Sequence, residues 1–164
     1  MKSITKNFFL IILSLSLVSC GYTLRGKLVL PDDVKNVAII TDVYSPISRE
    51  INLLLTNIGI ETTNRKLSDA YQIEIISEIH NKRQLSINQD GRVNEYELVF
   101  TVRFKINSPI ENGIGDSVVL YRDYQFDESR ILGTTDREEE IKNEMVSTAA
   151  SIVVNKLKAK IESM

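Results

Sequence analysis

The chain has 164 residues, a formal net charge of −2 at pH 7 and a hydrophobic fraction of 43%, which suits one globular domain with a sizeable core. Because it is mildly acidic and has no broad basic stripe, its composition argues against a nucleic-acid partner. A single histidine and a single cysteine rule out a histidine-rich metal site and an internal disulfide.

Residues 1–19 are predicted to be a lipoprotein signal peptide. Lys2 and Lys6 precede an apolar run, from Phe8 to Val18, that is too short to span a membrane. The run leads into Leu17-Val18-Ser19-Cys20, which resembles the lipobox of bacterial lipoproteins. This resemblance implies cleavage after Ser19 and attachment of a lipid to the sulfur of the next residue.

Cys20 is therefore the predicted lipid anchor, because a thiolate is the nucleophile that accepts the lipid. This covalent lipid is the only attached group that the sequence implies, and no cofactor is expected. A buried core cysteine is the competing interpretation, but no amphipathic pattern flanks Cys20. In the lipoproteins that the leader resembles, an Asp directly after the cysteine retains the protein in the inner membrane. This chain has Gly21 at that position, which is not a retention signal. The predicted location is the outer membrane, on its periplasmic side.

The mature chain is predicted to have a lipidated tether at residues 20–31 and a single domain at residues 32–164. A nearly continuous apolar run at residues 36–43 indicates a strand that is covered on both faces. Residues 45–59 indicate a helix, because Ser45 can cap it, Pro46 suits its first position and Gly59 can end it.

Three further strands are predicted at residues 70–80, 94–106 and 117–126, with a hairpin turn at Asp90-Gly91. The middle strand alternates with period two, so we expect one face to be buried and the other to be wet. The apolar face comprises Tyr96, Leu98, Phe100, Val102, Phe104 and Ile106. The other face comprises Glu95, Glu97, Thr101, Arg103 and Lys105, with Val99 as the exception.

The last helix is predicted to open at Thr135, which can form a capping box with Glu138. Its apolar stripe comprises Ile141, Met145, Ala149, Ile152, Val153, Leu157 and Ile161. The order strand, helix, three strands, helix predicts an α+β two-layer sandwich. We expect a four-stranded mixed or antiparallel sheet with two helices packed on one face.

The sequence predicts no catalytic residues and no metal site. Glu138, Glu139 and Glu140 could suggest acid–base carboxylates, but consecutive helical residues point to different sides. A phosphate-binding glycine-rich loop and a nucleophile elbow are both lacking from the sequence. We therefore expect a protein that is not an enzyme.

A set of ordered motifs across the mature chain resembles the LptE family of lipopolysaccharide-assembly lipoproteins. The motifs are Cys20 to Gly26, Leu30-Pro31, Asp90-Gly91, Glu95-Tyr96, Thr101-Val102, Arg122, Tyr124, Phe126, Asp127 and Glu144-Met145. The resemblance implies a protein that sits inside the LptD β-barrel, helps it fold, plugs it and binds lipopolysaccharide. A free-standing lipoprotein of the periplasmic face, which scaffolds or carries another envelope ligand, is the alternative hypothesis.

The resemblance also implies where lipopolysaccharide would bind. Some relatives carry basic residues at the hairpin tip and before the last helix, and these are the residues assigned to lipid A phosphates. Gln89 and Thr134 stand at those places here. Lys82, Arg83 and Arg92 are nearby substitutes and thus the candidate lipopolysaccharide contacts, since Arg suits phosphate well. Ordinary solvated charges at strand ends are the competing interpretation.

Overall fold

The computed structural model describes residues 30–31, 34–42, 44–127 and 131–163. The predicted signal peptide, the predicted anchor Cys20 and most of the predicted tether lie outside these ranges. Within them, no helix combines the length and the apolar character needed to cross a membrane.

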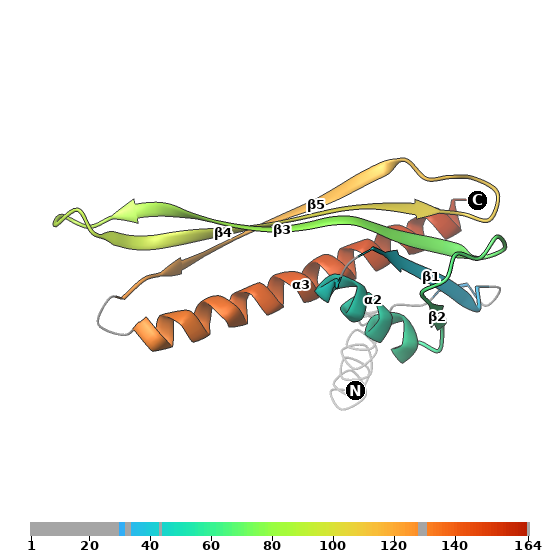
Figure 1. Cartoon of the computed structure of the whole chain (residues 1–164), viewed down its shortest axis with the longest axis horizontal. Coiled ribbons are helices and arrows are strands. Elements are labelled where there is room, and N and C mark those ends of the chain that lie inside the picture. Colours follow the sequence, from blue (N-terminus) through green and yellow to red (C-terminus); the bar gives the residue numbers. More distant parts are fainter. Residues whose placement is uncertain (1–29, 32–33, 43, 128–130, 164) are drawn as a thin grey trace, which may run out of the picture.

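A five-stranded sheet forms one layer of the molecule and two helices form the other (Figure 1). The strands are β1 (Asn36–Thr41), β2 (Glu61–Thr63), β3 (Tyr71–Ile87), β4 (Val93–Asn107) and β5 (Gly115–Gln125). The helices are α2 (Pro46–Asn57) and α3 (Ile131–Glu162). The strand order is β2-β1-β3-β4-β5, in which β1 is parallel to both neighbours and β3, β4 and β5 form an antiparallel meander. The predicted α+β two-layer class is confirmed.

The sheet has five strands rather than the predicted four, because β2 was missed. With only three residues, Glu61-Thr62-Thr63, β2 is too short and too polar to give a periodic signal. It forms because Gly59, at φ +85°, turns the chain back at the end of α2. The N–H of Glu61 then donates to the carbonyl of Lys35 (3.0 Å), which aligns β2 beside β1.

Helix α2 has the caps that the sequence predicts. The Oγ of Ser45 accepts a hydrogen bond from the N–H of Ser48 (3.0 Å), and Pro46 is the first helical residue. The carboxylate of Glu78, on β3, also accepts from the Ser45 hydroxyl and from the N–H of Ile47. An anionic group at a helix N-terminus is favourable, so this contact fixes α2 against the sheet.

Strand β3 ends seven residues later than predicted, at Ile87, and forms with β4 a long arm beyond the end of β1. The last residue of β3 that pairs with β1 is Ile75, and a β-bulge at Ile76 follows it. The bulge reverses which residues face the helices, because it adds one residue to one strand only. We define the hairpin arm as residues 77–103, whose β3 part pairs with β4 alone.

Helix α3 begins at Ile131, four residues before the predicted start. Thr134 and Thr135 therefore lie inside the helix, and the predicted capping box at Thr135 is wrong. The physical reason is that Glu138 does not turn back toward the helix start but binds side chains from other elements. Thr134 is buried, and its hydroxyl donates to the carbonyl of Asp127 (3.5 Å).

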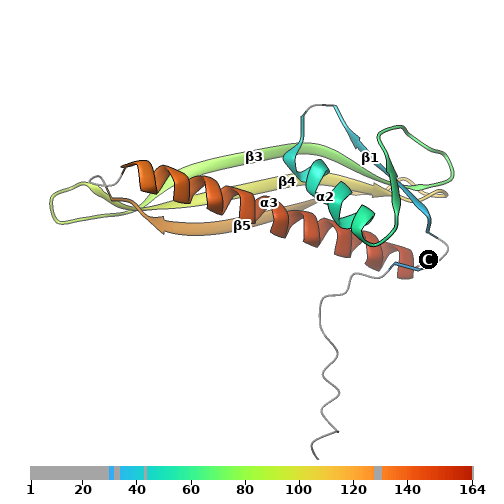
Figure 2. The ribbon, with the colours of Figure 1, turned by 90° about the horizontal axis from the view of Figure 1, so that it is seen from below.

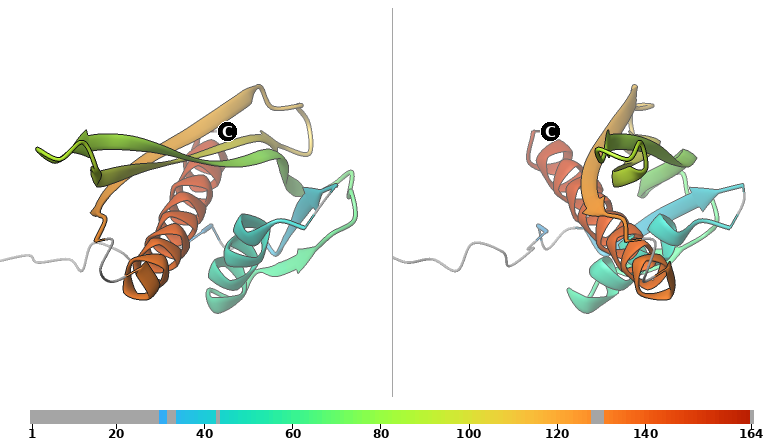
Figure 3. Two further views of the ribbon diagram at one scale, coloured as in Figure 1. Left: turned by 60° about the vertical axis from the view of Figure 1, so that its left-hand side comes forward. Right: turned by 90° about the vertical axis from the view of Figure 1, so that its left-hand side faces the viewer.

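The core lies between the sheet and the two helices. Both helices cover the same face of the sheet, and the opposite face of β3, β4 and β5 carries no helix (Figures 2 and 3). Phe100 from β4 and Met145 from α3 are completely buried at the centre of this interface. The other fully buried large side chains are Phe104, Ile47, Ile51, Leu55, Ile73, Leu98, Leu157, Val37, Val102 and Val153.

Candidate functional site

The candidate lipopolysaccharide contacts all lie on the hairpin arm and its tip. At the tip, the side chain of Asn88 accepts hydrogen bonds from the N–H groups of Asp90 and Arg92, both at 3.0 Å. Gly91 has φ +75°, which a residue with a side chain adopts at a cost. The predicted Asp90-Gly91 turn is therefore confirmed, and it fixes the start of β4.

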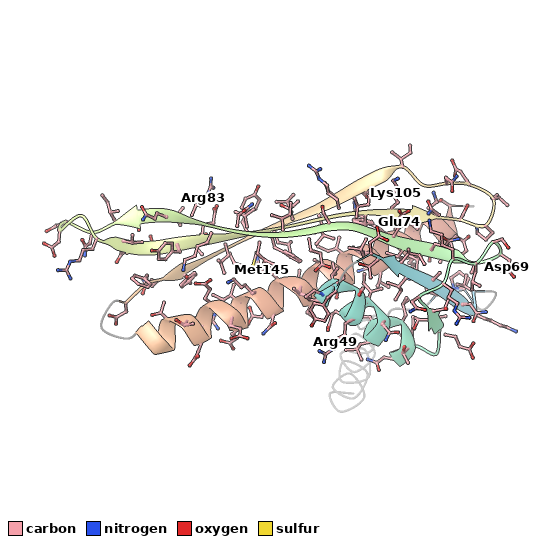
Figure 4. The ribbon with its side chains drawn as sticks, viewed as in Figure 1. Arg49, Asp69, Glu74, Arg83, Lys105 and Met145 are labelled. Atoms are coloured by element: carbon pink, nitrogen blue, oxygen red, sulfur yellow. The ribbon has the colours of Figure 1, made fainter. Side chains whose placement is uncertain are left out.

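Lys82 and Arg83 lie on opposite faces of the arm. Lys82 pairs in register with Leu98 and so faces the helices, whereas Arg83 pairs with Glu97 and faces the open side. Figure 4 shows Arg83 pointing away from the helix layer. The structure therefore does not bring these two cations together into one site.

The carboxylate of Glu138 is the centre of a charged cluster that joins β3, β4, β5 and α3. The Nζ of Lys82 lies 2.6 Å from Oε2 of Glu138 and 4.1 Å from the centre of the Tyr96 ring. The hydroxyl of Tyr124 donates to the same carboxylate oxygen at 2.5 Å, and Lys142 binds the other oxygen at 2.6 Å. This cluster ties the arm to the first turns of α3.

The protonation states in the cluster are fixed by these contacts. Burial alone would raise the pKa of Glu138, but hydrogen bonds from the two lysines and from Tyr124 lower its pKa to about 2. Burial would lower the pKa of Lys82, but its hydrogen bond to Glu138 raises it. Burial and the hydrogen bond to Glu138 both raise the pKa of Tyr124. At neutral pH Glu138 is therefore a carboxylate, Lys82 an ammonium group and Tyr124 a neutral phenol.

Arg83 forms an ion pair across the open face. Its Nε lies 2.5 Å from Oε2 of Glu97, and the hydrogen bond raises the pKa of Arg83. The Arg83 side chain is 65% exposed, whereas the Glu97 side chain is only 11% exposed. The prediction that Glu97 lies on a wet face is therefore wrong, because the neighbouring strands and Arg83 cover it.

Arg92 lines a cavity of about 470 Å³ at the tip, between the start of β4 and the end of β5. The cavity is lined by Asn88, Asp90, Arg92, Val93, Asn94, Gln125, Phe126 and Asp127. Lys82 and Arg83 are not among these residues. Arg92 thus belongs to a separate site, which also contains the oppositely charged residues Asp90 and Asp127.

The open face carries an apolar patch that sequence reasoning missed. Ile79, Val119 and Tyr121 are 45%, 42% and 55% exposed, and their strand partners place them on the side opposite the core. The alternation of β4 alone could not reveal this, because two of the three residues come from β5. We call Ile79, Val119 and Tyr121 the open-face patch.

The described residues contain no group of three or more His, Cys, Asp or Glu side chains that could hold a metal ion. Every buried side-chain nitrogen or oxygen atom among them has a hydrogen-bond partner. His80, an exposed residue on the helix side of the arm, stacks on the ring of Phe100 with 4.1 Å between ring centres.

Two solved structures share this architecture and define the class of fold. Rare lipoprotein B from Shewanella oneidensis has a TM-score of 0.70 at 21% identity, covering 76% of this chain and 95% of that chain. Lipoprotein B from Nitrosomonas europaea has a TM-score of 0.70 at 24% identity, covering 87% and 93%. The fold is that of small α+β bacterial lipoproteins.

Sequence comparison then assigns the family within this class. The LptE family model, described as lipopolysaccharide-assembly, matches residues 33–157, and the chain belongs to the LptE family. The LPS-assembly lipoprotein LptE of Pectobacterium atrosepticum is 28% identical over 156 residues, covering 91% of this chain and 84% of that protein. That of Yersinia enterocolitica is 29% identical over 142 residues, covering 84% and 68%. The family is one of assembly lipoproteins and not of enzymes.

Proposed function

We propose that this protein is an outer-membrane lipoprotein that partners and plugs an LptD-like β-barrel, assists its assembly and supports the insertion of lipopolysaccharide into the outer leaflet. The observation that carries the proposal is the match of residues 33–157 to the LptE family. The leader supports the location, since its lipobox implies a covalent lipid on Cys20 at the periplasmic side of the membrane.

The open sheet face is the surface that we assign to the barrel. It combines the open-face patch with the Arg83–Glu97 ion pair and with the basic residues Arg103 and Lys105. An apolar centre with a charged rim is typical of a protein interface. The helix face is engaged in the core and is less suited to a partner.

The hairpin tip is the place that we assign to lipopolysaccharide. Arg92 lines the tip cavity, and guanidinium groups bind phosphates through paired hydrogen bonds. Arg83 is 65% exposed and lies further down the arm on the open face. Lys82, which the sequence suggested as a third contact, is engaged by Glu138, so it supports the arm and is the weakest of the three candidates.

Co-purification tests the proposed partnership. The full chain with a C-terminal affinity tag is extracted from outer membranes in mild detergent, and bound proteins are identified by mass spectrometry. We expect a large outer-membrane barrel in stoichiometric amount. Recovery of the lipoprotein without a barrel would support the alternative of a free-standing envelope lipoprotein.

A further inference from the structure

The loop between β4 and β5 presents two isoleucines to solvent at the end of the molecule opposite the hairpin tip (Figure 1). Ile110 is 83% exposed and Ile114 is 90% exposed, and among the described large apolar side chains only Tyr44, at 84%, is as exposed. We call residues 108–114 the isoleucine loop. Two such side chains on one short loop expose apolar surface that a core would normally cover.

The isoleucine loop is held in this conformation by its own hydrogen bonds. The N–H of Ser108 donates to the carbonyl of Glu111 (2.9 Å), and the N–H of Glu111 donates to the Ser108 hydroxyl (3.0 Å). The N–H of Gly113 donates to the side chain of Asn107 (2.8 Å). A Cβ at Gly113 would lie 2.0 Å from the carbonyl oxygen of Ile106, so only glycine fits there. The isoleucines are therefore presented by a fixed scaffold.

The charges behind the loop balance one another. Lys156 lies 2.5 Å from Asp116 and Lys160 lies 3.7 Å from Glu111. These four residues line a cavity of about 430 Å³ together with Ile114 and the last turns of α3. The lysine stems can lie along an apolar surface while their ammonium groups remain in a polar layer. This end of the molecule therefore combines exposed isoleucines with lysines whose charges are balanced, which suits the boundary between a polar layer and an apolar one.

The described chain enters the sheet at the same end of the molecule as the isoleucine loop. Val37 of β1 pairs with Tyr71, and the next residue, Gln72, pairs with Asn107 directly before the isoleucine loop. Leu30, where the described chain begins, is buried in the core. Lys156 and Lys160, near the C-terminal end of α3, line the same cavity as Ile114 of the isoleucine loop. Cys20 precedes Leu30 by ten positions, so the connecting chain reaches at most about 33–36 Å. A lipid on Cys20 would hold this end near the bilayer.

We propose that the isoleucine loop inserts Ile110 and Ile114 into the phospholipid bilayer that holds the anchor, as a second membrane contact. A protruding pair of side chains fits a fluid apolar phase, which needs no complementary pocket. Because the lysines are balanced by Glu111 and Asp116, insertion depends on apolar burial and little on anionic lipid. The inference rests on the anchoring part of the proposed function, and it does not depend on the barrel partner or on the hairpin tip.

The chain has no tryptophan, so a single introduced tryptophan reports its own surroundings. The full lipidated chain carrying Ile114→Trp is placed in vesicles of phosphatidylethanolamine and phosphatidylglycerol, with and without brominated acyl chains. We expect blue-shifted emission that brominated lipid quenches. Tyr44→Trp is the matched control, because Tyr44 is equally exposed but lies between β1 and α2. Its emission should stay red-shifted and unquenched.

Two further measurements distinguish a missing lipid anchor from a loop that does not insert. Intact mass of the same preparation establishes acylation of Cys20, so loss of the anchor is distinguished from failure of the loop. Adding Ile110→Ser to the Ile114→Trp chain should reduce quenching, while anionic lipid content should change it little. Identical, unquenched emission from positions 114 and 44 in an acylated preparation would overturn the proposal. Protection of position 114 only in the barrel complex would also overturn it, in favour of a protein contact.

Discussion

Lys82 and Arg83 are adjacent in the chain, yet Lys82 Nζ lies 2.6 Å from Glu138 on α3 and Arg83 Nε lies 2.5 Å from Glu97 on the open face. One cation therefore fixes the arm to the helix layer and the other forms part of an exposed surface. Substitutions at these two neighbours should have different consequences, the first on stability and the second on contacts with partners.

Acid should weaken the Lys82–Glu138 contact. The pKa of Glu138 is lowered from 4.5 to about 2 in the folded chain, so its stabilising effect is complete above about pH 5. The effect is lost as the pH falls from about 5 to 2, and after discounting for solvent screening it amounts to about 1–3 kcal/mol. Urea unfolding at several pH values should show a shallower acid dependence for Glu138→Gln than for the wild type.

Glu140→Gln is the matched control for that experiment, because Glu140 pairs with Arg137 between two exposed side chains on the same helix. Its acid dependence should follow the wild type. Parallel pH profiles for Glu138→Gln and the wild type would show that the cluster does not stabilise the fold.

The core of the arm should be far more sensitive than its open face. Phe100 is fully buried, so Phe100→Ala should lower the free energy of unfolding by about 3–5 kcal/mol. Glu97→Ala should cause a much smaller shift, because the Arg83 partner that it releases is already 65% exposed. Thermal unfolding of both variants checks the order, and equal shifts in Tm would contradict the assignment of the two faces.

Charge reversal at the tip should weaken lipopolysaccharide binding. Arg92→Glu places a carboxylate beside Asp90 and Asp127 in the tip cavity, which would repel lipid A phosphates. The loss should be greater at low salt, where screening is weakest. Arg49→Glu, which makes the same charge change on α2, is the control (Figure 4). Equal binding by the two variants would remove Arg92 from the site.

Disrupting the open-face patch should break the barrel complex without unfolding the chain. Tyr121 is 55% exposed, so Tyr121→Asp should leave the melting temperature nearly unchanged. We expect loss of barrel co-purification from this variant, whereas Tyr44→Asp should still bring down the barrel. Retention of the barrel by Tyr121→Asp would assign the interface to another face.

Removing the thiol should prevent anchoring. Cys20→Ala has no nucleophile for the lipid, so the chain should accumulate as an uncleaved or misdirected precursor. Intact mass and membrane fractionation measure this result. A wild-type mature mass without acyl chains on Cys20 would contradict the predicted location.

Local signals in the sequence predicted much of the architecture. Asp90-Gly91 identified the hairpin, and the alternation around Phe100 identified the buried face, because both depend on neighbours in the chain. The extension of β3 over residues 81–87 was missed, since its polar residues are stabilised by pairing with β4. The contact between Lys82 and Glu138 joins residues 56 positions apart, and no local pattern reports it.

The bulge at Ile76 determines how the arm responds to the loss of a residue. Ile75 faces the core and Ser77 already faces the open side, so deleting Ile76 would leave a regular ladder and move no side chain to the other face. Deleting Asn81 would instead turn Lys82 outward and Arg83 toward Glu138. Deleting one residue of β3 would thus leave every side chain on its face at position 76. Five residues later, at position 81, the same change would exchange the faces of Lys82 and Arg83.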